Sequence, residues 1–185
     1  MAKAPSQFLA LLRGINVGGK NVIAKEALKQ CFEDLGYSDV RTYIQSGNIL
    51  FRSAEVSAKK LTKAIEVGLS QRFSYQAKAV VLSQKKYKSA VQAARDDWGT
   101  NDEQKHNGLF TMSGITPKRV LALLPAPKTD IETVTTGPGV IFWSVSKRHL
   151  SQTTLMKLSK EPVYQQMTVR NHNTVFKLLE LFEST

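Results

Sequence analysis

The chain has 185 residues, 42% of them apolar and 22% charged, which is the composition of a folded globular protein and excludes a disordered one. No apolar run approaches the roughly 18 residues that a membrane span needs. The N-terminal stretch lacks a signal-peptide cleavage pattern, and the single cysteine, Cys31, excludes an internal disulfide. We therefore expect a cytoplasmic protein with no membrane partner.

The charge is strongly basic and unevenly distributed. The net charge is +11, and residues 1–92 carry 15 basic and 6 acidic side chains, whereas residues 93–185 carry 11 and 9. Such a field attracts polyanions, including nucleic acid. Scattered lysines that only keep the protein soluble explain the same balance, so the charge leaves both interpretations open.

The first half of the sequence predicts a strand, a helix and then a hairpin. Residues 8–13 form a short apolar run that ends at a glycine, as a buried strand does. Apolar residues from Ala24 to Leu35 recur at helical spacing, and Gly36 is the expected stop. The β-rich runs that follow are separated by Ser46-Gly47 and cover residues 40–45 and 48–53.

A second helix and a last strand complete the first half. Ser57 can cap a helix whose inner face ends at Phe73, and residues 76–83 form a strand. The order strand, helix, strand, strand, helix, strand is that of the ferredoxin-like fold. We assign residues 1–83 to this N-terminal half.

We expect the second half to repeat the same order. A linking helix and loop cover 84–106, with Tyr87 and Trp98 on one helix face, and an α+β half with a C-terminal helix covers 107–185. The elements expected in that half are strands at 108–113, 130–136, 140–146 and 167–170, a helix started by Thr116-Pro117, a helix at 155–166 broken by Pro162, and a C-terminal helix opened by Asn173.

Several strands of the first half are apolar at consecutive positions, as in Leu9 to Leu12 and Ile49 to Phe51. A half-exposed antiparallel sheet alternates instead, so both faces of this sheet should be covered. We therefore expect an α+β protein with antiparallel sheets, in which two ferredoxin-like halves pack into one body.

This topology places two glycine-containing segments at the same edge of the first sheet. One follows the first strand (13–21) and the other joins the second and third strands (45–48), so they should be neighbours. Glycine lets backbone N–H groups approach a ligand closely, Arg13 and Lys20 add positive charge, and amide or hydroxyl side chains can bond a phosphate. The candidate ligand-binding residues are Arg13, Gly14, Asn16, Gly18, Gly19, Lys20, Asn21, Gln45, Ser46, Gly47 and Asn48.

Ordinary turn formation is the alternative, because glycine and asparagine both favour turns for their own backbone reasons. A nucleotide-hydrolysing P-loop is disfavoured. Gly14, Gly19 and Lys20 match that motif, but Asn21 lacks the hydroxyl that holds Mg²⁺, and a hairpin follows where a parallel sheet is required.

A second group of candidates precedes the C-terminal helix. Arg170 and Asn171 come just before its expected start, where an anion is favoured, although capping is again the alternative. The three histidines lack metal-ligand spacing, and Cys31 falls on the inner face of a helix, so we predict no metal site. No catalytic residue and no cofactor can be named.

The segments ALLRGINVGGKN, VRTYIQSGN and TVRNHNTVFKLLEL resemble a bacterial family of conserved hypothetical proteins that is classed as a domain of unknown function. The resemblance covers about Phe8 to Leu181, and His172 stands where the family usually has a tryptophan. It implies an α+β protein with ferredoxin-like halves and brings no activity.

Our leading hypothesis is a cytoplasmic protein that binds a phosphate-bearing, nucleotide-like ligand at residues 13–21 and 45–48, with an unknown reaction or none. The alternatives are non-specific nucleic-acid binding by the basic half, and a protein-interaction module without a small ligand. The oligomeric state cannot be read from the sequence.

Overall fold

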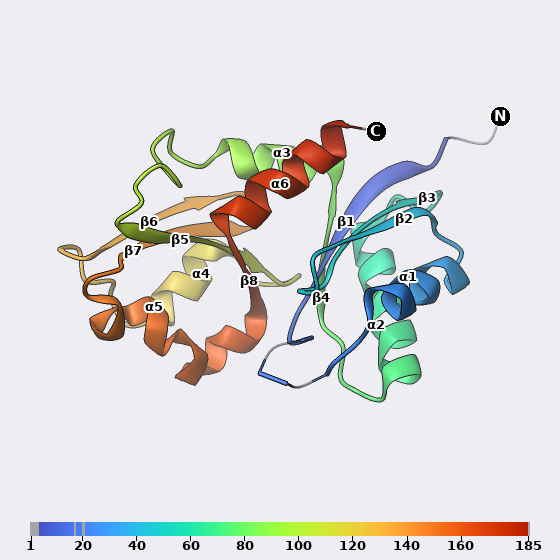
Figure 1. The fold of residues 1–185 in the computed structure, drawn as a ribbon, viewed down its shortest axis with the longest axis horizontal. Coiled ribbons are helices and arrows are strands. Elements are labelled where there is room, and N and C mark those ends of the chain that lie inside the picture. The colour runs from blue at the N-terminus through green and yellow to red at the C-terminus, as the bar shows by residue number, and fades with distance from the viewer. Residues whose placement is uncertain (1–3, 17, 20, 185) are drawn as a thin grey trace. The chain divides into compact units, whose positions relative to one another are not determined.

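The computed structural model describes residues 4–16, 18–19 and 21–184 of the chain. The chain divides into two compact units, Met1–Tyr87 and Lys88–Thr185, and each has an α+β architecture (Figure 1). Within the described residues, no helix is long and apolar enough to cross a membrane.

The first unit has the predicted βαββαβ order. Its four-stranded sheet has the order β2-β3-β1-β4, and every neighbouring pair is antiparallel, which is the ferredoxin-like arrangement. Its elements are β1 (Ser6–Leu12), α1 (Lys25–Asp34), β2 (Ser38–Tyr43), β3 (Asn48–Ser53), α2 (Ala58–Phe73) and β4 (Ala79–Ser83).

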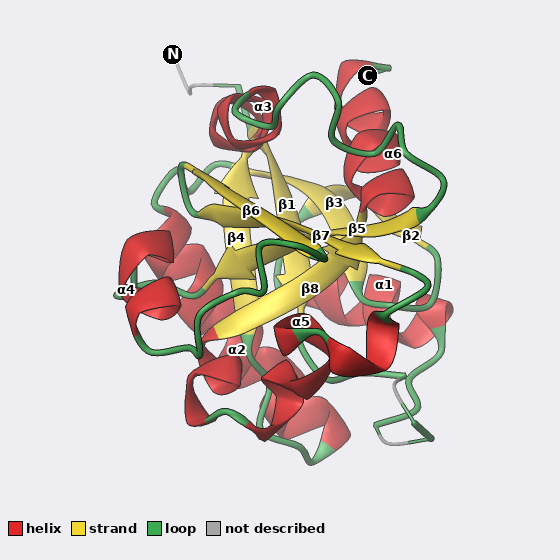
Figure 2. Cartoon of the chain, turned by 90° about the vertical axis from the view of Figure 1, so that its left-hand side faces the viewer, coloured by secondary structure: helices red, strands yellow, loops and turns green. Residues whose placement is uncertain are grey.

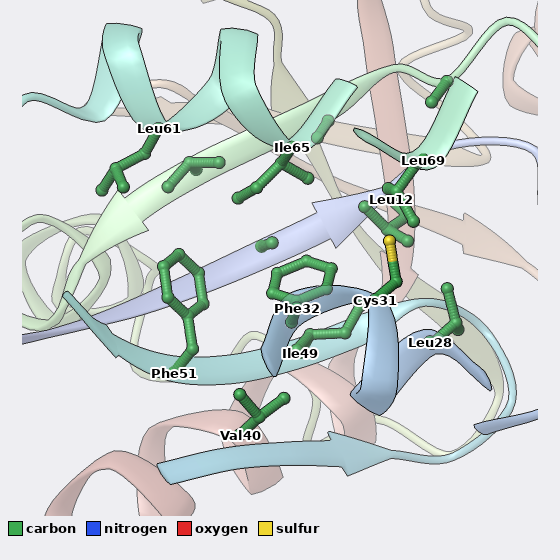
Figure 3. Close-up of a cluster of buried hydrophobic side chains, with 14 of the residues drawn as sticks. Leu12, Leu28, Cys31, Phe32, Val40, Ile49, Phe51, Leu61, Ile65 and Leu69 are labelled. Carbon is green, nitrogen blue, oxygen red and sulfur yellow. The ribbon is translucent and has the colours of Figure 1, made fainter. Parts of the chain in front are cut away.

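Both helices of this unit pack on one face of the sheet. Alternate residues of β1 (Phe8, Ala10 and Leu12) join Phe32 of α1 and Ile65 of α2 in one buried cluster (Figure 3). The cluster also contains Cys31, and burial raises the pKa of its thiol. The cysteine therefore serves as a core residue, as its position on the helix predicts.

The second unit repeats the strand order of the first. Its sheet runs β6-β7-β5-β8, again antiparallel throughout, so the predicted second ferredoxin-like half is present. Its helices and strands are α3 (Gln84–Gln92, which starts in the first unit), β5 (Gln104–Thr111), α4 (Pro117–Ala122), β6 (Glu132–Gly137), β7 (Val140–Ser146), α5 (Thr154–Lys157), β8 (Met167–Asn171) and α6 (His172–Glu183).

Helices cover both faces of this second sheet. In Figure 1, α3 and α6 lie on one side of the strands, and α4 and α5 lie on the other. Leu109, Ile141 and Trp143 pack with Val120 of α4 in a buried cluster on the α4 side. Strand β8 forms the edge of the sheet beside the short helices around α5 (Figure 2).

Three local predictions need correction. The linking helix α3 ends at Gln92, so Trp98 lies in a turn after it and not on a helix face. Strand β2 ends at Tyr43, because Ile44 has a positive φ of 48° and begins the turn. Helix α6 is capped by Asn171, whose Oδ1 accepts from the Thr174 N–H at 2.9 Å, and Asn173 lies inside the first turn.

The weak helix expected at 155–166 is broken up, as Pro162 suggested. It consists of α5 followed by short 3₁₀ turns at Leu158–Lys160 and Pro162–Gln166. The buried carboxylate of Glu132 holds this region: it accepts from the Leu155 N–H (3.1 Å), the Lys128 N–H (2.9 Å) and Trp143 Nε1 (3.2 Å). Burial opposes the charge, but these backbone hydrogen bonds leave the pKa of Glu132 below its ordinary value.

Candidate functional site

The loop after β1 and the turn between β2 and β3 lie side by side, as the strand order predicts. Asn16 Nδ2 donates to the Gln45 carbonyl oxygen at 2.6 Å, and the Leu12 N–H donates to the Gly47 carbonyl oxygen at 2.8 Å. A Cβ at Gly47 would lie 2.7 Å from Leu12 Cβ and 2.8 Å from Ile15 Cδ1. The two segments therefore meet so closely that only glycine fits between them.

Two asparagines hold the loop in shape. Asn16 has a φ of 52°, and its side chain pairs with the backbone of Ile23 through both Oδ1 (2.8 Å) and Nδ2 (3.0 Å). Asn21 has a φ of 48°, and its Nδ2 donates to the Gly14 carbonyl oxygen at 2.8 Å. Their amide groups thus support the loop itself, in the way that asparagine supports turns generally.

Asn48 has a comparable internal role in the neighbouring turn. Its side chain is 1% exposed, and Nδ2 donates to the Tyr43 carbonyl oxygen (3.1 Å) and to Ser46 Oγ (3.0 Å). Gly47 is also buried, whereas Gln45 is exposed. Of the predicted turn residues, Gln45 is the one that presents its side chain most openly to solvent.

The part of the loop that faces solvent is its glycine backbone. Gly14, Gly18 and Gly19 are exposed, have φ values of 71°, 58° and 73°, and would place a Cβ with no atom within 4 Å. Arg13 is half-buried at the base of the loop, where its N–H donates to the Lys78 carbonyl oxygen at 2.9 Å. Lys20, the second predicted cation, lies outside the described residues.

Helix α1 starts several residues after the exposed glycines. The helix begins at Lys25 after an Ala24 cap that makes no side-chain hydrogen bond, six residues beyond Gly19. The dipole of a helix acts within its first turn. The exposed amides of Gly18 and Gly19 are therefore distinct in sequence from the N–H groups of that first turn.

Arg170 and Asn171 belong to the second unit and have partners there. Arg170 is 6% exposed, and its Nη1 donates to Thr168 Oγ1 and to the Val169 carbonyl oxygen, both at 2.8 Å. Asn171 caps α6. Both side chains thus have a structural use at the junction of β8 and α6.

The second unit also contains a polar cavity that the sequence did not predict. It measures about 300 Å³ and lies against β5, β6 and β7, with His106 and Ser144 among its lining residues. His106 and Ser144 are paired across β5 and β7. In the sequence, Ser144 is a polar position within an otherwise apolar strand. That His106 faces it depends on how the two strands are aligned, which the sequence alone does not show.

The comparisons with known proteins place the chain in a family without assigning it an activity. No curated protein matches the chain. A solved structure described as the conserved bacterial protein SP0830 from Streptococcus pneumoniae is similar to it, with a TM-score of 0.85 and 29% sequence identity over 97% of this chain and 99% of that one. Residues 6–142 match the model of the family described as "Protein of unknown function (DUF1697)". Because this match covers well over half of the 185 residues, the chain belongs to the DUF1697 family.

Proposed function

We propose that this protein binds a phosphate-bearing small molecule at the loop of residues 13–21. The observation that carries the proposal is the exposed, positive-φ backbone of Gly18 and Gly19 on a loop held by Asn16 and Asn21. Backbone amides in such turn conformations form concavities that accept anions. Arg13 at the base of the loop, and Lys20 by its place in the sequence, would add positive charge.

The length of the loop supports a role beyond connection. In the first unit, residues 13–24 join β1 to α1, whereas in the second unit residues 112–116 join β5 to α4 at the equivalent place in the fold. Five residues therefore make this connection where the first unit uses twelve. Loops longer than the fold requires are where binding residues concentrate.

The internal bonds of the asparagines define which groups would contact the ligand. Asn16, Asn21 and Asn48 already hold backbone groups, so they would position the loop and not bond the phosphate. The expected contacts are the glycine amides, Arg13, Lys20 and the exposed Gln45. Strand β1 pairs antiparallel with both of its neighbours, whereas a P-loop protein has a parallel sheet at this place. We therefore do not propose that the protein hydrolyses a nucleotide.

Isothermal titration calorimetry with inorganic phosphate, ADP, ATP and a single-stranded oligonucleotide tests the proposal. We expect the wild-type protein to bind at least one phosphate-bearing small molecule. The double variant Arg13→Gln/Lys20→Gln should bind it at least about tenfold more weakly, because charge-assisted hydrogen bonds are worth about 1.5–3 kcal/mol. The matched control, Lys59→Gln/Lys63→Gln on α2, removes the same charge and should bind normally.

A pair of glycine variants distinguishes an effect of the loop backbone on binding from the general effect of backbone strain. Gly19→Ala places a side chain over the loop, and Gly139→Ala makes the same change in the β6–β7 turn, at a φ of 74° with the same open surroundings. Only Gly19→Ala should weaken binding. The proposal is overturned if the wild-type protein binds none of the small ligands, or if the two glycine variants bind equally well. Binding of the oligonucleotide alone, falling about 0.7–0.9 log units per log unit of salt for each neutralised phosphate, would favour the nucleic-acid alternative.

A further inference from the structure

A serine and a histidine of the second unit are hydrogen-bonded to each other at the polar cavity, which is separate from the glycine loop. We propose that they form a catalytic pair that hydrolyses small, uncharged carboxylic esters, with Ser144 as the nucleophile and His106 as its base. This activity does not depend on the proposed binding of a phosphate-bearing molecule in the first unit.

Strand pairing places both side chains on the cavity side of the sheet. His106 of β5 is aligned with Ser144 of β7, and Ser144 is aligned in turn with Thr133 of β6. Side chains at aligned antiparallel positions stand on the same face of a sheet, and all three residues line the cavity of about 300 Å³. Trp143 and Val145, on either side of Ser144, pack in the buried cluster on the α4 side. Ser144 therefore points away from that cluster and toward the cavity.

The hydrogen bonds of His106 leave it ready to accept a proton from Ser144. Its Nε2 lies 3.0 Å from the Asn101 carbonyl oxygen, which can only accept, so this nitrogen carries the proton of the neutral ring. Nδ1 is then the acceptor, and Ser144 Oγ donates to it at 2.7 Å. A nucleophile within hydrogen-bond reach of a base that a third group orients is the arrangement that activates serine.

The surroundings of the pair favour an ester over an amide and a neutral substrate over a charged one. The group that orients His106 is a carbonyl, where a Ser-His-Asp triad has a carboxylate, so it stabilises the protonated ring less and suits the better leaving group of an ester. Arg95 and Asp97, which line the cavity, pair with each other at 3.0 and 2.9 Å, so their charges largely cancel. The small volume of the cavity suits a compact molecule.

The reaction consumes water and returns both residues to their starting state. Ser144 Oγ bonds to the carbonyl carbon of the ester while its proton moves to His106 Nδ1. The bond from that carbon to the leaving oxygen then breaks, and His106 gives the proton to the departing alcohol. Water attacks the acyl-serine in the same way, its proton passes through His106 Nδ1 to Ser144 Oγ, and the carboxylic acid leaves.

Thr133 offers a donor for the negative charge that develops on the carbonyl oxygen of the substrate. Its position is aligned with Ser144, and the Cβ atoms of aligned residues lie about 4.5–5.5 Å apart. Its hydroxyl makes no hydrogen bond within the described part of the chain. The hydroxyl is therefore available to donate to a substrate that Ser144 attacks.

Labelling of the full chain with diisopropyl fluorophosphate tests the nucleophile directly. The reagent forms a bond between its phosphorus and the oxygen of an activated serine and releases fluoride, and peptide mass spectrometry locates the label. We expect the label on Ser144 and not on Ser146, whose Oγ lies 3.3 Å from His149 Nδ1 and which does not line the cavity. The proposal is overturned if Ser144 is not labelled, or if Ser146 is labelled equally.

Hydrolysis of p-nitrophenyl acetate provides the matched comparison of variants. Ser144→Ala should lower kcat/KM at least about 100-fold because the nucleophile is lost, whereas Ser146→Ala should leave it unchanged. Thr133→Val removes one hydroxyl and should lower kcat about 100-fold, while Thr136→Val on the same strand, outside the cavity lining, should not. Hydrolysis by Ser144→Ala at the wild-type rate overturns the proposal, and equal rates for the two threonine variants overturn the role of Thr133.

Discussion

At the scale of single residues, Gly47 joins the two segments of the candidate site. Its φ of 72° is unfavourable for any residue with a side chain, and a Cβ would overlap Leu12 and Ile15. Gly14 has nearly the same φ, 71°, but open space around it. The two glycines thus separate the cost of backbone strain from the cost of a steric clash.

We expect Gly47→Ala to lower the free energy of unfolding by roughly 2–5 kcal/mol, the sum of left-handed strain and overpacking. Gly14→Ala should cost only about 1–2 kcal/mol, because it adds strain alone. Chemical denaturation of both variants measures the difference. Equal losses would mean that the turn moves away from Leu12 and Ile15 at no cost.

His172 makes stability depend on pH. Its ring contacts those of Trp98 and His106, with centroids 6.2 Å and 5.3 Å away. Burial, followed by the charge of His106, lowers the pKa of His172 below its ordinary value of 6.5. The unfolded chain therefore binds a proton at this residue more readily than the folded protein does.

Because the unfolded state takes up the proton first, the contribution of His172 to stability is complete above about pH 6.5 and decreases as the pH falls toward the lowered folded-state pKa. We expect His172→Phe, which keeps an aromatic ring, to show a smaller loss of unfolding free energy than the wild type between about pH 7.5 and pH 5. Urea denaturation across this range measures the slope. Parallel profiles for the two proteins would contradict the assignment.

At the scale of elements, helix α6 shows how a cap decides where a helix begins. The sequence has asparagine at both 171 and 173, and either can cap. Asn171 does so because β8 runs directly into the helix, which leaves no spare residues between them. The choice depends on where the strand ends, and residue preference alone does not contain that information.

Replacing the cap should therefore distinguish the two asparagines. We expect Asn171→Ala to cost about 1 kcal/mol, within the range of 0.5–2 kcal/mol for lost N-caps, because the Thr174 N–H loses its acceptor. Asn173→Ala should be neutral or slightly stabilising, since alanine is the better helix former. Thermal denaturation of both variants is the measurement, and a larger loss for Asn173→Ala would reverse the assignment.

At the scale of the whole molecule, the sequence predicted the repeated order of strands and helices better than it predicted the contacts of buried polar side chains. Strands β3 and β7 have the predicted bounds, 48–53 and 140–146, because each is an apolar run enclosed by turn residues. The meeting of loop 13–21 and turn 45–48 followed from strand order alone.

The features that were missed depend on distances across the fold. The spacing of Trp98 predicts a place on a helix face, but the helix ends at Gln92 and the chain turns there. Glu132 can be charged in a buried site because it accepts hydrogen bonds from residues 128, 143 and 155. These residues are far apart in the sequence, so no local sequence pattern predicts that they meet. The cavity at His106 and Ser144 depends on strand register in the same way.

The bracing of the glycine loop has a consequence for affinity. Asn16 and Asn21 restrict their own stretch of backbone when the chain folds, so the entropy of ordering it is lost at that step. Any molecule that later docks there is spared that penalty, and preorganisation of this kind allows even a small number of contacts to give useful binding strength.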